Sequence, residues 1–215
     1  MSSKEINEYY DATEDREVRP DLTVAVDIAA DPRIAIDCGC GAGADIKFLL
    51  EKGFKVYGFD IEDESILRCK KRFKSNKNVI LSKAGFGSYE YPRASLVVAD
   101  ASLFFCRKTE FDYVWSNIYE CLYPNGIFCG SFLGPDDAMA RSKYNNSAFW
   151  PDISVFNEKE VRKLLGNYEI YRFTEHKTSG KTPQGIPHDW HIFSVVAKKS
   201  NNSSKKTVDK SSPSF

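Results

Sequence analysis

Between residues 33 and 132, short apolar runs alternate with stretches whose apolar residues recur at helical spacing. The runs are rich in Val, Ile and Phe and are nearly continuous, which is typical of strands buried on both faces of a parallel sheet. The pattern therefore predicts strands that alternate with helices on both faces of one sheet. The predicted strands are 33–38, 55–60, 79–82, 95–100 and 127–132, the predicted helices are 45–53, 61–73 and 110–122, and Pro124-Asn125-Gly126 predicts a turn.

The alternation ends in the last third of the chain. Residues 157–166 predict a helix, with Asn157 as its N-cap and Gly166 as its stop. Two strands follow at 168–176 and 189–199, and the Gly/Pro-rich connection between them predicts an antiparallel hairpin. The expected fold class is therefore α/β and doubly wound, with a seven-stranded, mostly parallel sheet that ends in a C-terminal antiparallel hairpin.

The length of 215 residues suits one domain with a single core. We expect this domain to span residues 1–199, with residues 1–32 as an N-terminal helical cap. Residues 200–215 are rich in Ser, Lys and Asn and have no apolar periodicity, so they predict a disordered polar tail.

The charge balance narrows the range of partners. Lys plus Arg and Asp plus Glu both number 30, and no basic stripe of the kind that binds nucleic-acid phosphates is present. A nucleic-acid partner is therefore not expected. No secretory signal is visible, and no apolar run approaches the roughly 20 residues that cross a membrane. We expect a cytoplasmic protein, monomeric or homodimeric, with no membrane partner.

The six cysteines lie mostly inside apolar segments, which suits reduced thiols in the core. Cys38 and Cys40 are spaced as C-x-C, but no second pair completes a zinc set. No metal site is predicted.

The strongest chemical signal is the loop Asp37-Cys38-Gly39-Cys40-Gly41-Ala42-Gly43 after the first strand. Glycines let a backbone turn sharply and approach a ligand closely at the start of a helix. Asp60 ends the second strand, where an acidic residue can accept hydrogen bonds from both hydroxyls of a ribose. The loop and Asp60 together predict a ligand that contains adenosine.

The glycine spacing alone leaves two cofactors open. Gly39-x-Gly41-x-x-Ala44 also satisfies the loose pattern of dinucleotide-binding loops. A pyrophosphate is anionic, however, and Asp37 at the mouth of the loop and Asp45 just inside the helix would oppose it. The same carboxylates suit S-adenosylmethionine (SAM), which carries an ammonium and a sulfonium. SAM is therefore the favoured cofactor.

Residues 35–66 resemble the opening half of class I SAM-dependent methyltransferases, and within that class they are similar to the tellurite-resistance methyltransferase subgroup. The resemblance extends from Tyr9-Tyr10 to residues 188–199. One departure is Ala44, where many relatives carry Arg, so a basic group near the site is missing. The resemblance implies a SAM-binding role for a set of residues: Asp37 for the ammonium, Gly39, Gly41 and Gly43 for the methionine part, Asp60 for the ribose, Ile61 and Phe86 for the adenine, and Ala99 and Asp100 where cofactor and acceptor meet.

Three polar segments are candidates for the acceptor side. The first holds Tyr9, Tyr10, Arg16 and Arg19, as a lid or as a solvated N-terminal helix. The second holds the three histidines of the chain, and His188 is expected in the hairpin connection as the better base. The third is the long connection 134–154, whose aromatic residues could wall a pocket or form a satellite cluster. The candidate catalytic residues are His188, Tyr10, Arg19 and His176, and the remaining members of these segments are His191, Tyr144, Phe149 and Trp150.

The sequence predicts an enzyme that transfers a methyl group from SAM to a small-molecule or inorganic acceptor, such as a chalcogen oxyanion or a thiol. Positioning can supply much of the catalysis, and a base is needed only if the acceptor must lose a proton. Two alternatives remain at this level: an NAD(P)-binding oxidoreductase with the same loop, and a SAM-binding module without catalysis.

Overall fold

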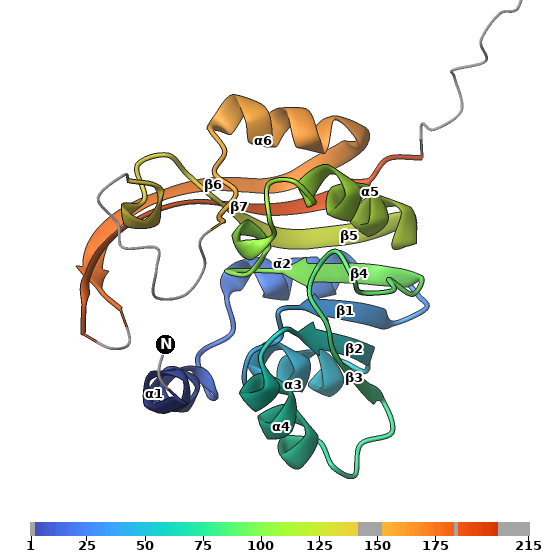
Figure 1. Ribbon diagram of the computed structural model, residues 1–215. Helices are drawn as coiled ribbons and strands as arrows, with labels where there is room; N and C mark the ends of the chain where they lie inside the picture. The colour runs from blue at the N-terminus through green and yellow to red at the C-terminus, as the bar shows by residue number, and fades with distance from the viewer. Residues whose placement is uncertain (1–2, 142–151, 183–184, 202–215) are drawn as a thin grey trace, which may run out of the picture.

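A seven-stranded sheet forms the centre of the protein, with strand order β3-β2-β1-β4-β5-β7-β6 (Figure 1). The computed structural model describes residues 3–141, 152–182 and 185–201. Strands β1 to β5 are mutually parallel, and β7 runs antiparallel to both β5 and β6. This topology confirms the predicted fold class. The strands are β1 (Ile34–Cys38), β2 (Lys55–Asp60), β3 (Val79–Lys83), β4 (Ala94–Ala99), β5 (Leu122–Leu133), β6 (Tyr168–Lys181) and β7 (Pro187–Lys199).

Helices cover both faces of the sheet. The α-helices are α1 (Ser3–Thr13), α2 (Pro20–Ile28), α3 (Ala44–Glu51), α4 (Asp63–Arg72), α5 (Phe111–Cys121) and α6 (Glu158–Leu164), and the short 3₁₀ turns are η1 (Leu103–Phe105), η2 (Ala138–Ala140) and η4 (Leu165–Asn167). Helices α2, α3 and α4 pack on one face, and α5 and α6 pack on the other. Helix α1 lies apart from the sheet, beside α4 (Figure 1).

The buried strand β4 shows why the sheet needs both layers. All six of its residues are buried. Val97 and Ala99 belong to the core on the α5 side, whereas Leu96 and Val98 belong to the core on the α2–α4 side. Successive side chains of a strand point to opposite faces, so a continuous apolar run requires cover on both sides.

The C-terminal hairpin is longer than its apolar pattern predicts. Strand β6 continues to Lys181, and β7 already begins at Pro187. Proline is tolerated as the first residue of a strand because it need not donate to the ladder there. His188 therefore lies on β7, paired with Gly180, and its predicted place in the connection is wrong.

The helix before the hairpin begins as predicted. The Asn157 side chain accepts from the Glu160 amide, and the Glu160 carboxylate accepts from the Asn157 amide, which completes a capping box. The helix itself ends at Leu164, and Gly166 lies in the following turn η4 rather than at the stop.

Strands β1 and β4 are neighbours, but the chain leaves β1 toward one face and β4 toward the other. Their carboxyl ends form the switch point of the sheet, where open α/β sheets bind ligands. The loop 39–43 follows β1 there, and Asp100 follows β4. Of the helices in the described residues, none has the length and apolar character needed to cross a bilayer.

Candidate cofactor-binding site

The glycine loop is held against the end of β2. The amides of Gly39 and Cys40 both donate to the carbonyl of Phe59, at 2.8 and 2.9 Å. Gly39 has φ +72°, and a Cβ on it would lie 2.7 Å from the Cβ of Ser102. The Ser102 hydroxyl in turn donates to the carbonyl of Cys38, at 2.5 Å. A side chain at position 39 would therefore need both a strained backbone and a shift of Ser102.

Asp60 connects the second strand to this loop. Its Oδ2 accepts from the Gly41 amide at 2.9 Å, and its Oδ1 accepts from the Glu62 amide at 3.0 Å. Burial raises the pKa of Asp60, although these hydrogen bonds act in the opposite direction. One carboxylate oxygen thus accepts from the glycine loop, and the other accepts from the backbone just after β2.

Asp37 and Asp45 form a pair of buried carboxylates at the loop. Asp37 is 3% exposed and Asp45 is 7% exposed. Burial raises the pKa of Asp37 well above its usual value, and the charge of Asp45 raises it further. Asp37 Oδ2 and Asp45 Oδ1 have no hydrogen-bond partner, and Tyr168 Oη is the one further buried side-chain atom of this kind in the described residues. Two unpaired acceptors at one loop fit a cationic ligand with N–H donors.

The segment between α1 and α2 brings two arginines to this end of the sheet. Arg16 Nη2 lies 2.5 Å from Asp45 Oδ2, and Arg19 forms an ion pair with Asp100. Proline at the first position of α2 places Arg19 directly before the helix. Two of the predicted site residues, Arg19 and Asp100, are thus in direct contact.

Tyr10 lies over the glycine loop. It is 5% exposed, and a Cβ on Gly41 would come within 3.8 Å of its ring. Burial, with the carboxylates of Asp60 and Glu62, raises the pKa of Tyr10. Its hydroxyl is therefore protonated at neutral pH and suits hydrogen bonding better than proton abstraction.

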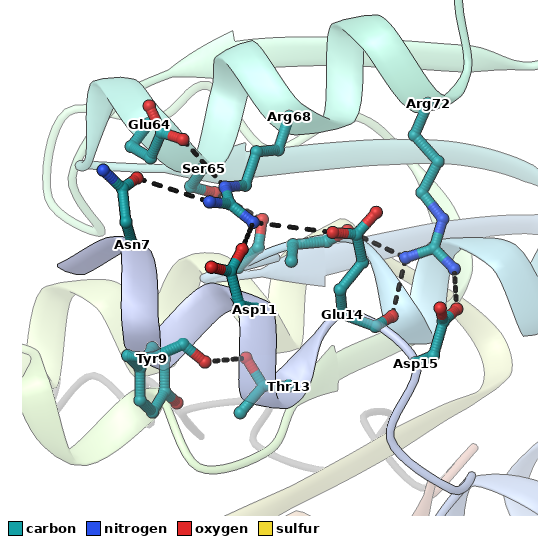
Figure 2. A network of polar contacts seen from close by, with 12 residues as sticks. Asn7, Tyr9, Asp11, Thr13, Glu14, Asp15, Glu64, Ser65, Arg68 and Arg72 are labelled. Carbon is teal, nitrogen blue, oxygen red and sulfur yellow. Dashed lines mark hydrogen bonds and ion pairs between the residues drawn. The ribbon is translucent and has the colours of Figure 1, made fainter. Parts of the chain in front are cut away.

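Figure 2 shows how α1 is held in this position. Arg68 of α4 donates to Asp11 at 2.7 Å and to Glu64 at 2.8 Å. Arg72 donates to Asp15 at 2.7 Å and to the carbonyl of Glu14 at 2.6 Å. Arg72 also reaches the carbonyl of Ala42 in the glycine loop, at 3.1 Å. One arginine thus ties the N-terminal segment and the loop to the same helix.

The predicted adenine contacts Ile61 and Phe86 follow the neighbouring parallel strands β2 and β3. Ile61 is 47% exposed, and a Cβ on Gly85 would lie 3.6 Å from its Cδ1. Phe86 packs edge-on against Phe59, with ring centroids 5.4 Å apart. Ala99 is fully buried at the end of β4. An exposed Ile61 side chain next to the loop after β3 leaves apolar surface where an adenine could pack.

All three histidines lie on the hairpin, and two of them, His188 and His191, contact Asp137. This carboxylate is fully buried and accepts from the amides of Met139 and His191, both at 2.9 Å. His188 Nε2 lies 3.1 Å from Asp137 Oδ1. His176 is exposed on β6. The structure thus brings Tyr10 to the glycine loop and Arg19 to Asp100 after β4, and it places His188 and His176 on the hairpin.

His191 has a defined tautomer. The amide of Asp136 donates to its Nδ1 at 3.0 Å, so that nitrogen carries no proton. The proton of the neutral ring is then on Nε2, which donates to Glu175 Oε1 at 2.9 Å. Both ring nitrogens are engaged in holding β6, β7 and the turn after β5 together.

Sequence reasoning missed several residues of the site. The partners Ser102, Arg72 and Asp137 are separated from their contacts by 30 residues or more along the chain. Contacts between residues so far apart in the sequence cannot be predicted from local patterns. The predicted aromatic residues of the connection 134–154 (Tyr144, Phe149 and Trp150) lie outside the described residues.

Comparison with known proteins agrees with this geometry. Residues 35–126, from β1 into β5, match the model of a methyltransferase domain. No curated protein sequence matches the chain.

Solved structures of SAM-dependent enzymes share the fold. TehB from Haemophilus influenzae superposes with a TM-score of 0.69 at 18% identity, over 85% of this chain and 62% of that one, so the match spans less than two thirds of the TehB chain. The 1,6-didemethyltoxoflavin-N1-methyltransferase from Burkholderia thailandensis, solved with bound 1,6-didemethyltoxoflavin and S-adenosylhomocysteine, gives a TM-score of 0.64 at 18% identity, over 93% of this chain and 87% of that one.

A third structure, the magnesium protoporphyrin IX methyltransferase ChlM from Synechocystis PCC 6803 with bound SAM, gives 0.63 at 16% identity and covers 92% of each chain. At these identities the likeness shows the fold alone, and the domain match covers residues 35–126. Over residues 35–126 the chain is therefore similar to a methyltransferase domain, and its fold is the one that these SAM-dependent enzymes share.

Proposed function

We propose that this protein transfers the methyl group of SAM to a small acceptor. The observation that carries the proposal is the pair of unpaired, buried oxygens on Asp37 and Asp45. A protonated amine satisfies such acceptors and offsets their charge, whereas a diphosphate would add negative charge beside them. This charge preference supports SAM over a dinucleotide.

Each part of SAM has a residue proposed to bind it. Asp37 receives the ammonium, and the bend at Gly39 lets the methionine part approach the backbone closely. Asp60 accepts from the ribose hydroxyls, and Ile61 packs on the adenine. These roles follow the family resemblance, and the exposure of Ile61 beside Gly85 supports the last of them.

SAM supplies a methyl carbon bonded to a positively charged sulfur. The acceptor forms its bond to that carbon as the carbon–sulfur bond breaks, and S-adenosylhomocysteine leaves. The task of the protein is to align the acceptor and to exclude water. Arg19 and Asp100 lie at the end of β4, where the acceptor would meet the donor, and Tyr10 covers the loop.

The acceptor is proposed to be a small molecule or an inorganic ion, with a chalcogen oxyanion or a thiol as the first candidates. The balanced charge of the chain gives no support for a nucleic-acid substrate. Arg19 could orient an anionic acceptor. His188 is a weaker candidate for a base because its Nε2 already contacts Asp137.

Calorimetric titration with SAM, S-adenosylhomocysteine and NADH tests the donor. We expect binding of the first two and none of NADH; tight NADH binding without SAM binding would instead make the protein an oxidoreductase. An acceptor screen that follows S-adenosylhomocysteine release, with tellurite, selenite, thiols and small amines, then tests turnover. Tight SAM binding with no turnover across the panel would favour a non-catalytic binding module.

A further inference from the structure

Arg16 is a cation inside a site that is built for a cationic ligand. Its side chain is 26% exposed and reaches Asp45 at the start of α3. A guanidinium so close to the glycine loop would repel the ammonium and the sulfonium of SAM. Asp45 already pairs with this guanidinium in the absence of a ligand, and a ligand that also brings an anion to this place would be attracted by it rather than repelled. In SAM that anion is the carboxylate of the methionine part.

We infer that Arg16 binds the methionine carboxylate of SAM, while the unpaired oxygens of Asp37 and Asp45 accept from the neighbouring ammonium. The inference rests on the proposed use of SAM and adds a residue that recognises its amino-acid end. Carboxylate and ammonium are attached to the same carbon atom, so a ligand presents both charges side by side. The protein presents the complementary charges side by side as well, because Arg16 contacts Asp45 directly.

The guanidinium has donors to spare. Arg16 donates to Asp45 at 2.5 Å through Nη2 and to the carbonyl of Glu17 at 3.3 Å through Nη1. A guanidinium carries five N–H groups, and it pairs with a carboxylate through two parallel hydrogen bonds. The contact with Asp45 fixes the orientation of the planar guanidinium group of Arg16 and leaves its other N–H groups for a ligand.

The surrounding charges keep Arg16 ionised. Burial acts to lower its pKa, but the carboxylates of Asp45, Asp100 and Asp37 more than offset that effect and raise it. Arg16 therefore interacts electrostatically with the carboxylates in and after β1 and with the carboxylate after β4.

Arg19 is the alternative residue for this role, and its position argues against it. Its side chain is 44% exposed, and it pairs with Asp100 after β4 rather than with Asp45 at the loop. Arg19 thus faces the acceptor end of the site. Arg16 also brings a basic group from the N-terminal segment to the start of α3, where Ala44 has none.

A thermodynamic cycle with two ligands tests the inference. SAM and decarboxylated SAM are titrated into the wild-type protein and into Arg16→Ala. The ligands differ only in the carboxylate, so the wild-type protein is expected to bind SAM about 10- to 100-fold more tightly. In Arg16→Ala this preference should fall to within about twofold, since the partner of the carboxylate is gone.

Two further variants test whether the loss of preference comes from a change in folding rather than from the missing arginine. Arg16→Ala leaves the Asp45 charge without its partner, so the double variant Arg16→Ala/Asp45→Asn removes both and should show the same loss of preference. Arg107→Ala removes an exposed arginine whose partner Glu110 is 4.0 Å away, and it should keep the wild-type preference.

The outcomes separate the two proposals. If Arg16→Ala weakens SAM and decarboxylated SAM by the same factor, Arg16 does not bind the carboxylate and the inference is overturned while the SAM site stands. If the wild-type protein binds neither SAM nor S-adenosylhomocysteine, the proposed function fails, and the inference fails with it.

Discussion

The carboxylate of Asp60 accepts a hydrogen bond from the backbone amide of Gly41, with 2.9 Å between Oδ2 and N. The residue proposed to bind the ribose therefore also fixes the glycine loop. Ser65 adds a second tie, because its hydroxyl donates to the Gly41 carbonyl at 2.6 Å. Both polar groups of one glycine are thus held by side chains from the end of β2 and from α4, which orients the loop before a ligand arrives.

Replacing Asp60 with Ala should weaken SAM binding by about 1–3 kcal/mol, because two ribose hydrogen bonds and one loop contact are lost. Calorimetry with SAM measures the change. Asp63→Ala is the matched control: it removes a nearby acidic residue whose partner is Lys83, at 2.6 Å, and it should leave SAM affinity unchanged. Equal affinities of Asp60→Ala and the wild-type protein would show that the ribose lies elsewhere.

SAM binding should release protons in mildly acidic solution. Burial raises the pKa of Asp37 and of Asp45, and a bound ammonium favours the ionised carboxylates and so lowers both values. Affinity should therefore increase as pH rises from the ordinary carboxyl value of 3.8 through the raised pKa values.

Calorimetry in buffers of different ionisation enthalpy counts the protons released. In Asp37→Asn the release should become smaller and SAM binding weaker. The raised pKa of Asp37 also affects the stability of the ligand-free protein. It stabilises the folded state below pH 3.8, and this contribution is lost as pH rises through the raised pKa. A SAM affinity that is flat across this range would contradict the assignment of Asp37.

Gly39→Ala should lower both stability and SAM affinity by more than backbone strain alone would. Gly39 and Gly53 both have positive φ, +72° and +80°, so alanine costs about 1–2 kcal/mol at either position. A Cβ on Gly53 meets nothing within 4 Å, whereas one on Gly39 meets Ser102 at 2.7 Å. We expect Gly39→Ala to unfold at lower urea concentration than Gly53→Ala and to lose SAM binding, while Gly53→Ala keeps it.

Local patterns predicted most of the parallel strands, because burial on both faces produces apolar runs within a few neighbouring residues. The predicted turn at residues 124–126 is wrong, since β5 begins at Leu122 and continues through it. Residues 55–60 were predicted as a strand, and β2 has those bounds. The contacts that complete the site are not local. Arg19 and Asp100 are separated by 81 positions in the chain, and Arg16 and Asp45 by 29. Charge pairs at such spacing are set by the fold, so the sequence placed Arg16 only in the N-terminal segment.

The histidines show a different limit of sequence reasoning. Gly185 and Pro187 suggested that the connection included His188, yet β7 begins at the proline. Whether a strand continues past such residues depends on pairing with its neighbour, here β6 up to Lys181. The resulting burial of His188 and His191 changes what these side chains can do.

His191 should contribute to stability rather than to proton transfer. Its Nδ1 accepts from the Asp136 amide, and its ring packs against Phe193 with centroids 4.9 Å apart. His191→Ala removes these contacts and leaves a buried gap, so we expect a loss of about 2–4 kcal/mol in the free energy of unfolding, measured in urea. His176→Ala, at an exposed position of β6, should change that free energy by less than about 0.5 kcal/mol. In a turnover assay with a responsive acceptor, the fall in activity of His191→Ala should follow its unfolded fraction. A fully folded His191→Ala protein that binds SAM normally but has lost turnover would make this histidine catalytic and refute the structural role.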